Sequence, residues 1–184
     1  MTLFRESADV SVRPAVPGDE AAIADAQVAA WRGAHGELLG GALDVLDIDA
    51  MTQQWAAAIT APPAGHRVLV ACAGATVVGF ASVAPVPSAD PMQPPGGVLL
   101  ALEVLPDHQR SGHGSRLLAA CVDLLREDGA DQLQTWVLDG DAARAQFLAG
   151  AGLGPDETVR ELASGPLPDG SERTVREHRW WATI

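Results

Sequence analysis

The chain has 184 residues, of which 47% are hydrophobic, and this size favours one domain with a proper core. Its formal net charge of −12 argues against nucleic acid or an anionic membrane as a partner, because binding either one needs a basic face. The same charge mildly favours a cationic substrate through electrostatic steering, although solubility alone is the simpler explanation.

The sequence shows no signal for export or membrane insertion. No run reaches the roughly 18 uncharged apolar residues of a membrane helix, and residues 1–12 carry Glu6 and Asp9 where a signal peptide has an apolar core. Cys72 and Cys121 lie inside apolar runs, so we expect buried thiols in a reducing compartment. No Cys/His cluster has the spacing of a zinc site. We therefore expect a cytoplasmic protein without a metal.

The first half of the chain predicts a strand, two helices and a β-hairpin, in that order. Apolar and polar residues alternate in the strand, apolar residues recur at helical spacing in the helices, and two valine-rich runs flank Gly74 in the hairpin. Asp19 is a plausible N-cap or first-turn acid for the first helix. We expect these elements at Val10–Arg13, Asp19–Gly33, Ile48–Ile59, Arg67–Ala73 and Thr76–Ala84.

The second half predicts a strand, a helix, a strand, a helix and two final strands. A proline-rich loop at 85–97 precedes them and is a candidate substrate-side loop. We expect the elements at Gly97–Leu105, Gly112–Arg126, Gln132–Leu138, Ala142–Ala149, Leu153–Glu161 and Thr174–Trp181. Together these elements form one expected domain over residues 10–184, behind a flexible arm of residues 1–9.

The most informative stretch lies between the strand that ends near Pro106 and the helix that follows. Its loop contains Gly112 and Gly114, and the free N–H groups at a helix start bind anions, of which phosphate is the usual one. We therefore expect a phosphate or pyrophosphate site at Gln109–Ser115. The P-loop is excluded because the chain contains no lysine, and the dinucleotide fingerprint is excluded because Leu117 stands where its third glycine belongs.

The remaining pattern, Gln109-x-x-Gly112-x-Gly114 after an apolar strand, resembles the GCN5-related N-acetyltransferase (GNAT) superfamily. The stretch 30–39 is similar to a Trp-Arg-x-x-Tyr-x-x-Leu-Leu segment of one subgroup, with His35 in the tyrosine place. The resemblance implies an α/β (α+β) fold with a mixed, mostly antiparallel central sheet of six to seven strands. About four helices would flank this sheet, and it would splay at the central strand.

The same resemblance implies an acetyl-CoA-dependent N-acetyltransferase. It would move an acetyl group to a primary amine of a small molecule or peptide by direct transfer in a ternary complex, with coenzyme A as co-substrate. The loop amides would hold the pyrophosphate, and backbone groups of the central strand would bond the pantetheine arm like an added strand. The implied coenzyme A residues are Leu102, Val104, Leu105, Gln109, Arg110, Ser111, Gly112, His113, Gly114, Ser115, Asp141 and Phe147.

The chain departs from the family at 141–148. The family often has Asn-x-x-Ala/Ser-x-x-Phe-Tyr there, and its tyrosine commonly protonates the leaving thiolate. Here Leu148 stands in the tyrosine place, and the chain has no tyrosine at all. Either another group serves, or the thiolate leaves unassisted, or turnover is slow. Asp141 stands in the asparagine place and is equally well explained as a helix N-cap.

Two side chains are candidates for the catalytic base. Glu103 lies in an apolar strand, where burial would raise its pKa, unless it is an exposed residue at a bulge. His35 has a suitable pKa range but is also typical of a surface or capping histidine. We expect Trp31, His35 and Glu37 on the side of the acceptor substrate, although core packing is an alternative for Trp31.

Two other functions stay open. The missing tyrosine favours a non-catalytic acyl-CoA-binding domain that acts as a sensor or partner subunit. A plain structural or interaction domain fits the sequence least well, because it would need a blocked loop at 109–115. The resemblance also makes a homodimer through the terminal strands plausible, and the identity of the acceptor cannot be deduced from the sequence.

Overall fold

The computed structural model describes residues 10–86, 95–166 and 172–184, and its elements follow the predicted order. The arm at 1–9, most of the proline-rich loop and part of the final turn lie outside these ranges. The strands are β1 (Val10–Pro14), β2 (Arg67–Ala73), β3 (Thr76–Val86), β4 (Gly96–Val104), β5 (Gln132–Leu138), β6 (Gly154–Pro166) and β7 (Glu172–Thr183). The helices are α1 (Glu20–Leu39), α2 (Ile48–Thr60), α3 (His113–Glu127) and α4 (Ala142–Gly150), with 3-10 turns η1 (Gly40–Leu43) and η2 (Pro106–His108).

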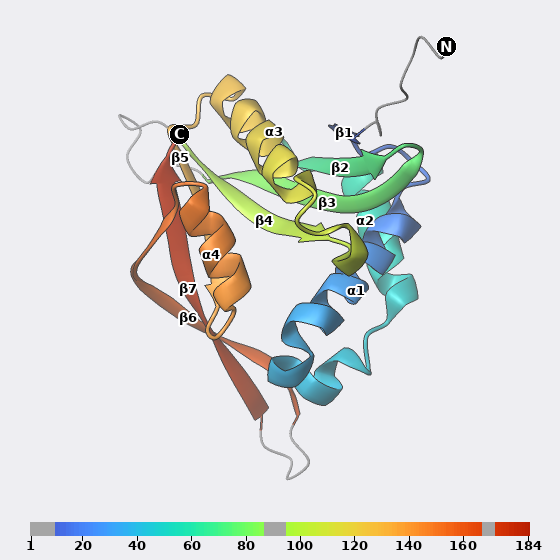
Figure 1. Ribbon diagram of the computed structural model, residues 1–184, viewed down its shortest axis with the longest axis vertical. Helices are drawn as coiled ribbons and strands as arrows, with labels where there is room; N and C mark the ends of the chain where they lie inside the picture. The colour runs from blue at the N-terminus through green and yellow to red at the C-terminus, as the bar shows by residue number, and fades with distance from the viewer. Residues whose placement is uncertain (1–9, 87–94, 167–171) are drawn as a thin grey trace, which may run out of the picture.

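The strands form one mixed sheet in the order β1-β2-β3-β4-β5-β7-β6 (Figure 1). Every neighbouring pair is antiparallel except β4 and β5, which run parallel and are joined through α3. In the described part of the chain, seven strands and four α-helices make up the fold. The predicted fold class is thereby confirmed.

Helices cover the two faces of the sheet differently. Alternate residues of β2 point to opposite faces, as in any strand. Leu69 and Ala71 belong to one apolar cluster with Leu117 of α3, whereas Val70 and Cys72 belong to a second cluster with Ile23 of α1. Residues of α4 join the first cluster, so α3 and α4 lie on one face and α1 and α2 on the other (Figure 1).

The sheet opens between β4 and β5. These strands pair only over Gly96–Leu99 and Gln132–Thr135, and the last link is a buried hydrogen bond of 2.9 Å from the Thr135 hydroxyl to the Leu99 carbonyl. On the side that pairs with β3, β4 has a bulge at Leu100. The β3–β4 register skips this residue, which is 56% exposed. The predicted splay at the central strand is confirmed, and we call this opening the fork.

The first helix is longer than the sequence predicts. The expected end near Gly33 is wrong, because α1 continues to Leu39. A glycine inside a helix costs only about 1 kcal/mol, and α1 packs against α2, β3 and β4. A Cβ on Gly33 would lie 3.6 Å from Pro106 of η2, so the glycine sits at a close contact and does not end the helix. The extension carries His35 to the fork.

Both cysteines are buried free thiols, as predicted. Burial raises the pKa of the Cys121 thiol to about 12. Among the described residues, no three His, Cys, Asp or Glu side chains gather as a metal-binding group. Nor is any helix in those ranges both long and apolar enough to cross a bilayer.

Candidate active site

A cavity of about 590 Å3 lies beside β4, beyond the point where β5 leaves it. Its lining comes from the end of α1, from β4, from the glycine loop (residues 109–115) and from α4. The predicted residues that line it are His35, Leu102, Glu103, Val104, Gln109, Arg110, Gly112, Gly114, Ser115, Asp141 and Phe147. The cavity therefore joins the predicted anion loop to both candidate bases.

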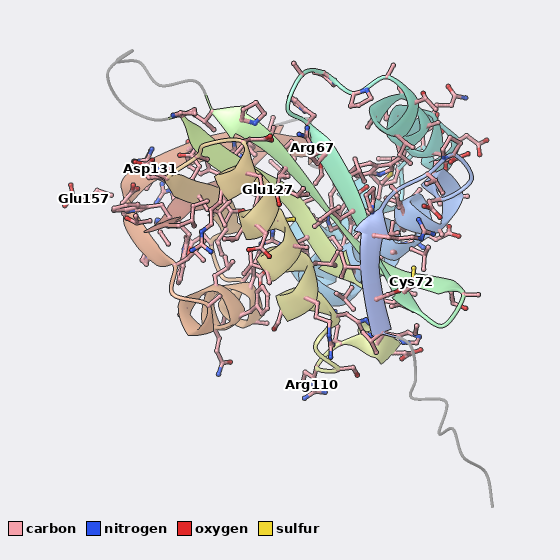
Figure 2. The ribbon with its side chains drawn as sticks, turned by 90° about the horizontal axis from the view of Figure 1, so that it is seen from above. Arg67, Cys72, Arg110, Glu127, Asp131 and Glu157 are labelled. Atoms are coloured by element: carbon pink, nitrogen blue, oxygen red, sulfur yellow. The ribbon has the colours of Figure 1, made fainter. Side chains whose placement is uncertain are left out.

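The glycine loop has the geometry of an anion site. Arg110 and Gly112 adopt left-handed conformations with φ of 58° and 83°, and Gly112 is the N-cap of α3 without a side-chain cap. The first turn of a helix leaves its N–H groups without helical partners, and its dipole is positive at that end. Arg116 folds back over Gly112 and donates to the Ser111 carbonyl at 3.3 Å. Figure 2 shows Arg110 on this loop, pointing away from the sheet.

Side chains already bond the open edge of β4. Gln109 Nε2 donates to the Val104 carbonyl at 3.1 Å, and Arg144 Nη1 donates to the Leu102 carbonyl at 3.2 Å. These are carbonyls of the strand segment that β5 leaves without a partner. A ligand that adds itself to this edge must displace these two donors or use other backbone groups.

Glu103 lies at the centre of the cavity. It pairs with Phe80 in the β3–β4 register and so faces α1, while its neighbours Leu102 and Val104 join the apolar cluster under α3. Its side chain is 15% exposed, and its Oε1 lies 3.3 Å from Nη1 of Arg144. Burial raises the pKa of the Glu103 carboxyl, and the Arg144 charge opposes this shift without cancelling it.

His35 reaches the same cavity from α1. Its Nε2 lies 3.6 Å from Oδ2 of Asp141, whose other carboxylate oxygen caps α4 by accepting from the Arg144 N–H at 2.9 Å. Asp141 is thus the N-cap of α4 and also lines the cavity, and its predicted contact with coenzyme A stays a prediction. Burial lowers the pKa of His35, and the neighbouring Asp141 charge partly offsets this. Nδ1 of His35 is buried without a partner among the described residues.

Some predicted site residues do not line this cavity: Trp31, Leu105, Ser111 and His113. The His113 side chain is only 3% exposed and lies against His108, with 6.1 Å between ring centroids. Trp31 is half-buried. Burial is the largest effect on the pKa of Glu103 and raises it, and the Trp31 side chain opposes this by favouring the charged form. The side chain of Glu37 lies outside the described part of the chain.

Arg144 is the residue that sequence reasoning missed. It projects from α4 and contacts both Glu103 and the Leu102 carbonyl, and its side chain is only 18% exposed. It stands at the position that the family pattern keeps small, as alanine or serine. An arginine at a position where the family pattern has a small residue is visible in the sequence, and it could have marked Arg144 as a candidate site residue.

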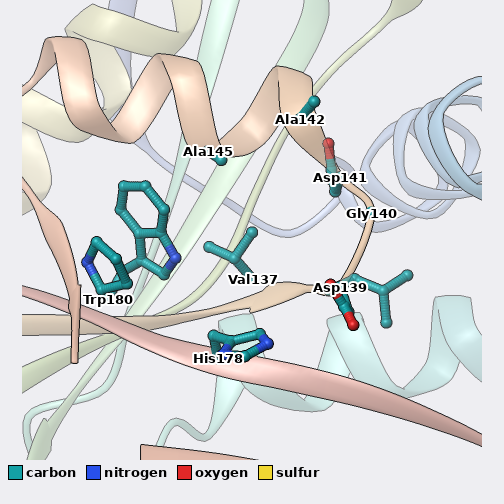
Figure 3. A pocket seen from close by; sticks show the side chains of 10 residues that line it. Val137, Asp139, Gly140, Asp141, Ala142, Ala145, His178 and Trp180 are labelled. Carbon is teal, nitrogen blue, oxygen red and sulfur yellow. The ribbon is translucent and has the colours of Figure 1, made fainter. Parts of the chain in front are cut away.

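A second cavity, of about 390 Å3, lies on the other side of α4 (Figure 3). It is lined by the end of β5, the start of α4 and residues of β7 that include His178 and Trp180. Asp141 borders both cavities. The second cavity contains no part of the glycine loop and neither candidate base, so it is not the place where acyl transfer would occur.

Comparisons with known proteins agree with this geometry. Residues 29–153 match the model of the acetyltransferase (GNAT) family. Among solved structures, the chain is similar to the PaiA N-acetyltransferase of Thermoplasma acidophilum in complex with coenzyme A, with a TM-score of 0.69 and 13% identity over 96% of this chain and 99% of that one. It is also similar to the putative acetyltransferase YncA of Salmonella typhimurium with acetyl-CoA, with a TM-score of 0.65 and 20% identity over 95% and 94%.

A third similar structure is the ribosomal-protein-alanine N-acetyltransferase of Brucella melitensis, with a TM-score of 0.63 and 21% identity over 95% of this chain and 99% of that one. A comparison with curated protein sequences gave no match. The structural likenesses show the fold, and the family match spans more than half of the sequence. The chain therefore belongs to the acetyltransferase (GNAT) family.

Proposed function

We propose that the protein transfers an acetyl group from acetyl-CoA to a primary amine of a small molecule or a peptide, by direct attack in a ternary complex. The observation that carries this proposal is the single cavity that joins the glycine loop to Glu103 and His35. A donor bound by its phosphates at the loop would place its acyl end beside these two groups. Holding donor and acceptor together in this way supplies much of the rate enhancement.

The residues present fit coenzyme A. The uncapped first turn of α3 and the positive φ of Gly112 leave backbone N–H groups for a pyrophosphate, with Arg116 beside them. The fork leaves one edge of β4 without a strand partner beyond Leu99, where an extended pantetheine arm can add. Two of the similar solved structures contain coenzyme A or acetyl-CoA. The likeness to an enzyme named for a protein alanine supports peptides as one class of acceptor.

The acceptor amine must be neutral to attack the thioester carbonyl. Glu103 and His35 are the two groups placed to take its proton, from β4 and α1 respectively. Burial raises the pKa of Glu103 and lowers that of His35, so both pKa values move away from the values that these groups have in water. His35 is then neutral at pH 7 and is ready to accept a proton.

The proposal is tested first by calorimetry with acetyl-CoA and coenzyme A. Thiol release is then measured with a panel of small amines and of peptides with different N-termini. We expect binding of both ligands and acetylation of at least one panel member. Failure of the purified protein to bind either ligand at millimolar concentration would refute the proposal.

A non-catalytic acyl-CoA-binding domain is the second candidate. Leu148 favours it, because a buried leucine replaces the usual acid. This candidate predicts binding of acetyl-CoA without thiol release for any amine in the panel. Thiol release that depends on an amine, and that Gly112→Trp abolishes, would rule it out.

A further inference from the structure

We infer that Arg144 replaces the missing tyrosine by stabilising the thiolate of coenzyme A as the thioester C–S bond breaks. This inference rests on the proposed acetyl-CoA-dependent function. Arg144 would act as a fixed positive charge and hydrogen-bond donor, because a guanidinium does not give up its proton in a protein. It would therefore be a catalytic residue of a different kind from the family's acid.

The position of Arg144 on α4 supports this role. Residues 144 and 148 are one helical turn apart and so share a face of the helix. Both line the cavity, and Leu148, in the tyrosine place, is only 1% exposed. The guanidinium of Arg144 reaches β4 itself, where it donates to the Leu102 carbonyl at 3.2 Å. Arg144 thus contacts the strand edge along which the pantetheine arm would run, from the same helix face as the tyrosine place.

The guanidinium also has hydrogen-bond donors that its contacts with the described residues do not use. It has five N–H groups, and within the described residues only Nη1 makes hydrogen bonds, to the Leu102 carbonyl and to Glu103. In the part of the chain that the structure describes, its buried Nε has no hydrogen-bond partner, which is costly unless a ligand or a rearrangement satisfies it. A thiolate is such a partner, and a charge-assisted hydrogen bond is strongest where water is excluded.

The charges around Arg144 come from three elements. Glu103 faces it from β4 at 3.3 Å, Asp141 lies one turn away at the start of α4, and His35 approaches Asp141 from α1. Glu103 thus pairs with the guanidinium while Asp141 bonds the backbone of the same residue, and an additional thiolate would be repelled by these two carboxylates. The repulsion falls when Glu103 accepts the amine proton, because the neutral carboxyl no longer holds Arg144 as an ion pair.

The step balances without any other reactant. The amine nitrogen forms a bond to the acyl carbon, and the electron pair of the C–S bond goes to sulfur. The nitrogen proton passes to Glu103 or His35 and reaches the sulfur when the thiol is released. Arg144 keeps its own proton throughout and pairs with the sulfur while it is negative.

The direct test measures the pKa of the thiol of bound coenzyme A from its thiolate absorbance. It compares the wild type with Arg144→Gln, and the absorbance of each protein without ligand is subtracted. In the wild type we expect this pKa to be lower than in Arg144→Gln by at least about one unit, which is the size of shift that one nearby opposite charge produces. Arg144→Lys should keep part of the shift.

Arg67→Gln is the matched control, because Arg67 pairs with Asp128 on the surface, away from the cavity. It should leave the thiol pKa unchanged. Equal thiol pKa values in the wild type and in a folded Arg144→Gln variant that binds coenzyme A would overturn the inference and leave the proposed function intact. Absence of coenzyme A binding in the wild type would overturn both.

A kinetic test separates this role from simple positioning. Arg144→Ala should lower kcat by about 10²–10³-fold, as the loss of one transition-state donor does, with little change in the KM for acetyl-CoA. Adding Leu148→Tyr should restore at least tenfold and introduce a fall in rate at alkaline pH that the wild type lacks. A raised KM with unchanged kcat, or a double variant no faster than Arg144→Ala, would contradict the inference.

Discussion

Glu103 and His35 show how burial acts on a carboxyl and on an imidazole in the same cavity. Burial raises the pKa of the Glu103 carboxyl and lowers that of the His35 imidazole, because it disfavours the charged form of each group. The neighbours oppose burial in both cases: Arg144 favours the Glu103 carboxylate, and Asp141 favours the His35 imidazolium. Burial thus makes the Glu103 carboxylate a stronger proton acceptor and keeps the His35 imidazole in its neutral, proton-accepting form.

The sequence identified some of these side chains because their type was unusual for their position. A glutamate in an apolar strand and a histidine in a tyrosine place are visible in one sequence, and both line the cavity. The contact of Arg144 with Glu103 joins residues on α4 and β4, and no local pattern encodes it. The sequence thus indicates which groups have an unusual environment, and only the fold shows which groups are partners.

Replacing Glu103 tests which group is the base. If Glu103 takes the amine proton, Glu103→Gln should lower kcat/KM by about 10²–10⁴-fold, the usual contribution of a general base. The rate of the wild type should fall as the pH drops through the raised pKa of Glu103, because the protonated carboxyl cannot accept a proton. A pH–rate profile of both proteins with one acceptor provides the measurement.

The control for this experiment is Glu161→Gln, which removes an exposed carboxylate that pairs with Arg176 on the surface. It should leave the profile unchanged. If Glu103→Gln keeps both the rate and the acidic limb of the wild type, His35 is the base, and His35→Gln should then remove that limb.

Adding one Cβ atom at Gly112 tests whether the glycine loop binds the donor. The φ of 83° at Gly112 strains any other residue, and a Cβ there would lie 2.7 Å from Nη1 of Arg116. We expect Gly112→Ala to displace Arg116 and to weaken acetyl-CoA binding at least tenfold, measured by calorimetry. Gly129→Ala is the matched control, since Gly129 has a φ of 86° but no atom within 4 Å of its would-be Cβ. Equal affinities of the two variants would show that the loop does not hold the donor.

At the scale of elements, the sequence predicts which segments form but not how far they separate. The order of strands and helices agrees with the prediction, because alternation and helical spacing are local signals. The length of the β4–β5 ladder is not local: it ends where the Thr135 hydroxyl bonds Leu99 and where β4 bulges at Leu100. From the residues alone the fork is therefore not predictable, and only the resemblance to a family implies it.

The contact between β1 and α1 depends on one buried carboxylate. Asp19 lies at the predicted N-cap position of α1, where its carbonyl accepts from the Ile23 N–H at 2.9 Å. Its carboxylate accepts from both Nη atoms of Arg13, at 2.6 and 2.9 Å, and from the Val16 N–H at 2.9 Å. These bonds lower the pKa of Asp19, with the Arg13 bond contributing most. They fix the end of β1 to the start of the helix that carries His35.

Asp19→Asn should therefore destabilise the protein by about 1.5–3 kcal/mol at pH 7, the range for hydrogen bonds to a charged group. Because the folded-state pKa is lowered, this stability is present above the unfolded pKa of about 3.9 and is lost as the pH falls through the folded value. Urea unfolding at several pH values measures it. Asp25→Asn, exposed on the same helix, should have no effect. A loss in Asp19→Asn that is independent of pH would contradict the role of the ion pair.

At the scale of the whole molecule, the site exists only because distant segments meet across the sheet. Glu103 faces α1, whereas Arg144 comes from a helix on the opposite face, and the two side chains meet beside the fork. The fork is thus the place where residues from both faces of the sheet come into contact. Under the proposed function, this arrangement would let one cavity take a donor along β4 and expose its acyl end to an acceptor from the α1 side.

The net charge of −12 gives a prediction about the acceptor. A strongly acidic protein attracts a cationic acceptor over distances of about a Debye length, roughly 10 Å at 0.1 M salt, and this attraction is screened as salt rises. For two peptides that differ only in a lysine or a glutamate beside the accepting amine, kcat/KM should fall with salt for the lysine peptide. It should rise with salt for the glutamate peptide.

The measurement is kcat/KM for both peptides between about 20 and 200 mM salt, a range over which the Debye length falls roughly threefold. Acetyl-CoA is kept saturating, so that effects of salt on donor binding do not enter. The kcat/KM values of the two peptides should converge at high salt, where only direct contacts in the cavity still distinguish the lysine peptide from the glutamate peptide. The same salt dependence of kcat/KM for both peptides would mean that the charge of the whole molecule serves solubility and does not act on the acceptor. A preference for the glutamate peptide at low salt would show that a local cation at the mouth, such as Arg110, outweighs the twelve excess negative charges of the chain.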